Sequence, residues 1–169
     1  MLVGLGGTIR FSSPVTPSTT ENSHMIQQTS RYGMGITVAL GYADAVARTK
    51  EALAAEGFGV LSEIDIAATL KKKLDVTFRP YVILGACNPP LAHRALMAER
   101  DIGLLLPCNV IVYAADEPNR CVVAAMDPVE ALHLTGNEQV RAVAEDVRAR
   151  MHRMLESVER AAADSTPPA

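Results

Sequence analysis

The sequence is short of aromatic side chains and of cysteine. Phe, Trp and Tyr together make up 4% of the 169 residues, and there is no Trp. Alanine, valine and leucine must therefore fill the core, and the 49% of apolar residues is enough to form one. Three cysteines, an odd number without regular spacing, do not make a disulfide framework and favour a reducing, cytoplasmic location.

Net charge and long apolar runs are also lacking. The charge is −3 and the pI is near 5.8, which argues against a nucleic-acid-binding surface. No apolar run approaches the roughly 18 to 20 residues of a membrane span. The chain contains no GxGxxG, P-loop, GxSxG or HExxH motif. We therefore expect neither nucleic acid nor membrane as a partner.

Composition divides the chain into three segments. Residues 1–33 are rich in Ser, Thr, Pro and Gly, and cannot bury enough surface to offset the entropy of ordering. We expect a disordered extension there, or residues ahead of the true start, with Met25 and Met34 as alternative starts. Residues 34–160 are predicted to form one α+β domain, and residues 161–169 a flexible tail.

Hydrophobic periodicity predicts nine elements within this domain. We expect strands at 36–40, 58–64, 80–86, 109–115 and 121–126, and helices at 43–56, 66–74, 89–99 and 138–160. The order β-α-β-α-β-α-β-β-α favours an antiparallel or mixed sheet with helices packed on one face. The other face needs a cover if it is apolar, and a homodimer is the simplest one.

Two features of the helices have plain structural interpretations. The last helix carries an apolar stripe at three- and four-residue steps that includes Met151 and Met154, and we interpret this stripe as core. The lysine run 71–73 is interpreted as solvated surface rather than a phosphate site.

Two similar segments gather unusual residue types. Residues 85–93 (GACNPPLAH) and residues 107–110 (PCNV) each place a Cys-Asn pair at the edge of an apolar strand. Asn88 occupies the N-cap position of a helix that begins at Pro89. Cys87 then lies just before a helix N-terminus, a place that favours negative charge and can lower a thiol pKa.

These motifs leave several interpretations open. In the structural one, the cysteines are core residues and Asn88 is a cap. Alternatively, both motifs line a pocket for a small ligand, or Cys87 is a reactive thiol with His93 as its partner. In the last, Cys87, Cys108 and His93 bind a soft metal, although the close cysteine pairs typical of zinc sites are absent. The candidate site residues are Cys87, Asn88, Pro89, Pro107, Cys108 and Asn109.

The same segments resemble the signature of a bacterial and archaeal family, domain of unknown function 302. Residues 57–65 (GFGVLSEID) and 70–74 (LKKKL) match its first half, and residues 103–110 (GLLLPCNV) its second. The resemblance spans roughly residues 35–155 and implies a compact α+β domain, with a topology like one half of the TATA-binding protein, that forms homodimers. One departure is Asp75, where the resemblance leads us to expect Gly.

From the sequence we predict a small cytoplasmic α+β domain that forms a homodimer and binds a small ligand at a pocket lined by the two Cys-Asn motifs. A thiol-dependent enzyme using Cys87 with His93, and a soft-metal-binding protein, are the alternatives. The sequence identifies no cofactor and no reaction.

Overall fold

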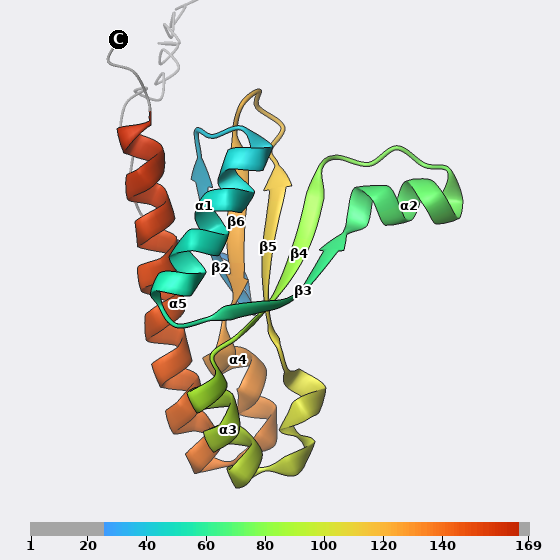
Figure 1. Ribbon diagram of the computed structural model, residues 1–169. Helices are drawn as coiled ribbons and strands as arrows, with labels where there is room; N and C mark the ends of the chain where they lie inside the picture. The colour runs from blue at the N-terminus through green and yellow to red at the C-terminus, as the bar shows by residue number, and fades with distance from the viewer. Residues whose placement is uncertain (1–25, 166–169) are drawn as a thin grey trace, which may run out of the picture.

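A six-stranded antiparallel sheet is the centre of the structure, a computed structural model that describes residues 26–165 (Figure 1). The strand order is β1-β2-β6-β5-β4-β3, and every neighbouring pair is antiparallel. The strands are β1 (Gln27–Ser30), β2 (Gly33–Val38), β3 (Gly59–Asp65), β4 (Tyr81–Cys87), β5 (Cys108–Ala114) and β6 (Cys121–Met126). The predicted α+β class is confirmed.

Helices lie on one face of the sheet and at one of its ends. They are α1 (Tyr42–Ala55), α2 (Ile66–Leu74), α3 (Pro89–Ala98), α4 (Pro128–Leu132) and α5 (Glu138–Asp164), with short 3-10 turns η1 (Arg100–Leu105) and η2 (His133–Thr135). Figure 1 shows α1 and α5 along the sheet, α3 and α4 together at one end, and α2 projecting away beyond β3. The helices other than α2 therefore enclose the core with the sheet.

Alternation along the strands separates two faces of the sheet. Val82 and Leu84 of β4 point to the core face, where α1 and α5 pack, and both are buried. On α5, Met151 and Met154 are fully buried in the same core. The methionines of the predicted stripe thus fill space between helix and sheet, because flexible thioethers adapt to irregular gaps.

Four helices begin at side chains that satisfy their first free N–H groups, and at α4 this side chain is Asp127, which accepts the N–H of Val129 at 3.0 Å. Asp65, Asn88 and Asn137 accept hydrogen bonds from N–H groups two or three residues ahead, at 2.8, 3.3 and 2.9 Å. These caps fix where α2, α3 and α5 start. They also fix where the preceding strand or loop stops.

Some boundaries differ from those expected. β1 and the first residue of β2 fall before residue 34, inside the segment expected to be an extension. Backbone pairing with β2 holds β1, and its polar composition does not signal that pairing. The last helix runs on to Asp164. Residues 1–25 and 166–169, which make up most of the expected extension and part of the expected tail, lie outside the described residues.

Candidate functional site

The structure brings the two Cys-Asn motifs together at one end of the sheet. In the pairing of β4 with β5, Ala86 lies opposite Cys108 and Gly85 lies opposite Asn109. Cys87 closes β4 beside this pair and stands next to Asn88, the cap of α3. Two segments about twenty residues apart in the chain are thus neighbours at one end of the sheet.

Both cysteines line a small apolar cavity beneath α3. Its volume is about 20 Å³, and its walls include Cys87, Asn88, Cys108 and Leu91. A space of this size holds about one water molecule, and its apolar walls offer few partners to such a water. A small-molecule ligand does not fit there.

Both polar atoms of the Asn88 side chain form hydrogen bonds, which together connect two helices. Its side-chain oxygen accepts the N–H of Leu91, and its Nδ2 donates to the carbonyl oxygen of Glu56 at 3.5 Å. Arg150 of α5 donates to the same carbonyl at 3.0 Å. The Glu56 carboxylate in turn accepts hydrogen bonds from Arg153 at 2.7 to 3.1 Å. Asn88 therefore ties the start of α3 to the end of α1.

The remaining candidate residues lie elsewhere at this end of the sheet. Asn109 is exposed on the face opposite the core, next to Gly85. A Cβ built at Gly85 would collide with Ser62 Oγ of β3 and with the Pro107 ring. Gly85 thus leaves room for both groups to approach the strand. Pro89 is exposed at the first position of α3.

Burial disfavours the thiolate form of both cysteines. It raises the pKa of Cys87, and together with the neighbouring Cys87 it raises the pKa of Cys108 to about 11. This direction is opposite to the lowered thiol pKa that the position of Cys87 before the α3 N-terminus leads us to expect, and its cause is desolvation by burial. His93 is exposed on α3, and no hydrogen bond joins it to Cys87.

Neither a metal cluster nor a membrane helix is found in residues 26–165. No three His, Cys, Asp or Glu side chains there gather closely enough to hold a metal ion, so Cys87, Cys108 and His93 do not form such a set. No helix in this part of the chain is long and apolar enough to cross a membrane.

The sheet face opposite the core carries a continuous apolar row. We call this surface the open face. Strand pairing aligns one residue from each of five strands across it, and we call them the isoleucine row: Ile64, Ile83, Ile111, Ala124 and Gly35. Ile64 is exposed, and Ile83 and Ile111 are only partly buried within the described part of the chain. Because apolar side chains lie on both of its faces, this sheet differs from an antiparallel sheet that has one apolar face toward the core and one polar face toward water.

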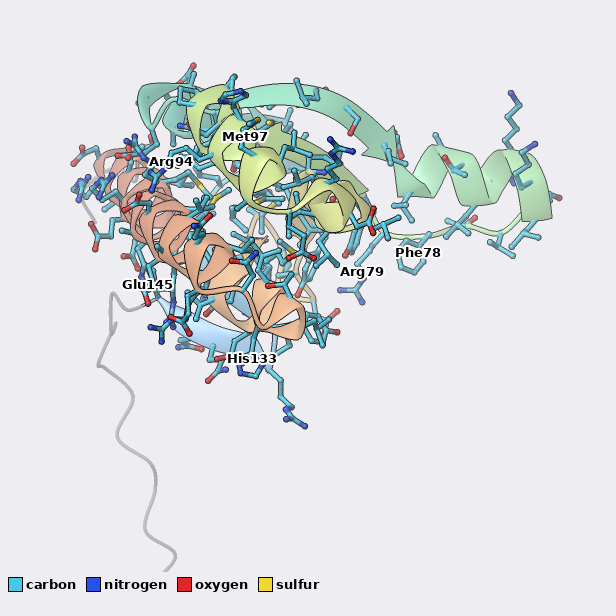
Figure 2. All side chains as sticks on the ribbon, turned by 90° about the horizontal axis from the view of Figure 1, so that it is seen from below. Phe78, Arg79, Arg94, Met97, His133 and Glu145 are labelled. Carbon is cyan, nitrogen blue, oxygen red and sulfur yellow. The ribbon has the colours of Figure 1, made fainter. Side chains whose placement is uncertain are left out.

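Aromatic residues extend the open face toward α2. Tyr81 and Tyr113 lie opposite each other on β4 and β5, and their rings stack with centroids 5.3 Å apart. Phe78 lies on the segment that links α2 to β4 (Figure 2). Its ring centroid is 6.1 Å from that of Tyr81. None of the residues of α2 is buried, and Leu74 at its end is 65% exposed. An exposed apolar surface therefore continues from the sheet onto this projecting segment.

The sequence did not predict the hydrogen bonds that Glu56 accepts from Asn88, Arg150 and Arg153. The two arginines lie 94 and 97 residues further along the chain, and no local pattern signals a contact at that distance. For the open face, the sequence predicted only that the second face of the sheet would need a cover if it were apolar. Its residues could have been found from the alternate positions of the expected strands, once strand order was known.

Comparison with known proteins agrees with this fold. Residues 34–158 match the family described as Domain of unknown function DUF302. A crystal structure of an uncharacterised conserved protein of the same description, from Bacillus stearothermophilus, is 28% identical in sequence and superposes with a TM-score of 0.70. The likeness covers 76% of this chain and 99% of that chain. No curated protein matches the sequence.

Proposed function

The chain belongs to the domain of unknown function 302 family, and we propose that it acts as a homodimer whose protomers cover each other's open face. The isoleucine row is the observation that carries this proposal. Contiguous apolar surface left in water marks a contact site. A second copy is the simplest partner, because soluble oligomers are mostly two-fold homodimers.

The proposal includes a small-ligand site at the rim of the paired faces. Ser62 and Asn109 are exposed polar side chains on either side of Gly85, and the isoleucine row lies two residue pairs further along the strands. A few polar groups within apolar surroundings are typical of ligand sites. The cavity of about 20 Å³ under the cysteines is too small to serve instead. A second protomer over the open face would close this rim into a pocket.

Sedimentation velocity of two matched variants tests the homodimer. Ile111→Asp places a charge in the middle of the isoleucine row, where burying it against a partner is unfavourable. Leu104→Asp makes the same kind of change at a side chain that is 88% exposed on η1. We expect wild type and Leu104→Asp to sediment as dimers and Ile111→Asp as a monomer with an unchanged circular dichroism spectrum. A dimeric Ile111→Asp would contradict the proposal.

Nuclear magnetic resonance titration tests the ligand site. Acetamide, acetate and glycerol are added to ¹⁵N-labelled protein as small amide, carboxylate and polyol probes. We expect at least one probe to shift the side-chain amide signals of Asn109, and Ser62→Ala to abolish that shift. Asn119, an exposed residue of the turn between β5 and β6, provides the control signal. Equal shifts at both asparagines, or none at Asn109, would argue against a site at this rim.

A further inference from the structure

In two of the three rows on the open face, side chains shrink from one edge of the sheet to the other, whereas the row of Ser62, Gly85, Asn109, Met126 and Gly33 does not follow this trend. The isoleucine row has Ile on β3, β4 and β5 but only Ala124 on β6 and Gly35 on β2. The parallel row two residues along repeats the trend in strand order, with Tyr81, Tyr113, Val122 and Thr37. We call β3, β4 and β5 the bulky half, and β6, β2 and β1 the small half.

The small half is recessed as well as small. A hollow of about 130 Å³ lies at the edge of this half, lined by Gly35, Thr37 and Val122 of the open face and also by Ile36, by Arg120 and by Glu159 of α5. A Cβ built at Gly35 would lie 2.6 Å from the carbonyl oxygen of Val123 and 2.8 Å from the Cβ of Ala124. The chain therefore cannot fill this recess with a side chain of its own at Gly35.

Symmetry limits how two such faces can meet. When two copies pack face to face, their two-fold axis lies in the plane of the interface. An axis across the strands places each half on the same half of the partner, so that Ile meets Ile and recess meets recess. An axis along the strands places each half on the opposite half. Close packing favours the second arrangement, because unfilled gaps forfeit dispersion contacts.

We propose that the two-fold axis of the homodimer runs along the strands, between β5 and β6, so that the bulky half of each protomer seats in the small half of its partner. This rests on the homodimer proposed above. Six strands placed symmetrically about that axis bring Ile111 over the partner's Ala124 and Ile83 over the partner's Gly35. Ile64 of β3 then lies over Gln27 of the partner's β1.

The area of the open face approaches that of specific dimer interfaces. At a strand spacing of about 4.8 Å and a rise of about 3.4 Å per residue, the open face measures about 24 Å by about 20 Å. Two such faces amount to about 960 Å² as flat rectangles, and corrugation by side chains increases the accessible area toward the roughly 1,200 to 2,000 Å² of specific interfaces. A second copy of this chain therefore fits the size of the surface.

Cysteine cross-linking distinguishes the two axes. Ile64→Cys and Gln27→Cys are each made in a Cys87→Ser background, and both positions are exposed. The variants are treated with a short bis-maleimide alone and after mixing under conditions that exchange subunits. We expect a covalent dimer only in the mixture. The Cys87→Ser protein without added cysteines controls for reaction at the buried Cys108 and Cys121.

Each other outcome overturns this arrangement. Cross-linking of Ile64→Cys with itself places the axis across the strands. A stable dimer in which the mixture does not cross-link leaves the homodimer standing but contradicts the axis. If the Cys87→Ser protein sediments as a monomer at every concentration, as wild type would then do, the homodimer itself is wrong. The two proposals thus fail in different experiments.

Discussion

Cys108 shows how burial decides the chemistry of a single side chain. It belongs to a motif that suggested a reactive site, yet it faces the core with Val110 and Val112 on the same strand. Removing the thiol from water disfavours its charged form, and the nearby Cys87 adds to that effect. Cys108 is therefore a small apolar core residue, and its burial keeps the thiol protonated.

The raised pKa of Cys108 predicts a loss of stability at alkaline pH. Burial raises the pKa of this thiol from an ordinary value of 9.0 to about 11, so between these values the folded state holds more protons than the unfolded state. Stability from this group is complete below pH 9 and falls as pH rises toward 11, by about 2 to 3 kcal/mol in total. Urea denaturation of wild type and Cys108→Ala at pH 8 and pH 10.5 measures it. If the free energy of unfolding falls by the same amount in both proteins between pH 8 and pH 10.5, the raised pKa of Cys108 is contradicted.

Among the elements, α2 departs most from the usual rule that a helix buries one face. It has nine residues, and none of them is buried in its own chain. Isolated helices of that length are marginal in water. Asp65 caps its start, and Asp75 ends it in the left-handed conformation at φ 55°. Its stability therefore depends on its two ends.

Asp75→Gly should stabilise α2 by about 0.5 to 1 kcal/mol, because glycine adopts a positive φ without steric cost. Hydrogen exchange of the α2 amides measures this local stability. Asp75→Asn removes the exposed ion pair with Lys71 but tolerates the same conformation, so it should change little. Faster exchange in Asp75→Gly would show that the ion pair matters more than the backbone.

The α5 helix has the opposite character, with its stripe deep in the core. Met151→Ala should lower the free energy of unfolding by about 2 to 5 kcal/mol, because it leaves a cavity under a fully buried side chain. Met97→Ala on α3, at a side chain that is 75% exposed, should change it by about 0.5 kcal/mol or less. Urea denaturation followed by circular dichroism compares the two. Equal effects would mean that the α5 stripe is not core.

Local signals predicted most of these elements. Asp65 and Asn88 were identifiable as caps, and the spacing of Met151 and Met154 revealed the buried face of α5. The strand β1 was missed because its residues, Gln-Gln-Thr-Ser, are polar and lack alternation. Its order comes from backbone pairing with β2, which does not depend on side-chain type.

At the scale of the whole molecule, long-range pairing decides what the sequence cannot show. The repeated Cys-Asn pattern predicted neighbouring strands at one end of the sheet. It did not show that Asn109 and Cys108 point to opposite faces, or that the shared cavity is too small for a ligand. The isoleucine row exists only because the order β2-β6-β5-β4-β3 aligns one residue from each strand.

The mass of the protein in solution tests the homodimer most directly. Light scattering coupled to size-exclusion chromatography, on the wild-type chain at several concentrations, gives that mass without reference to shape. One chain is 18.1 kDa, so a homodimer has twice that mass, 36.2 kDa. We predict about 36 kDa over the micromolar range. A constant mass of about 18 kDa up to roughly 100 µM would contradict the claim that two copies cover each other's open face.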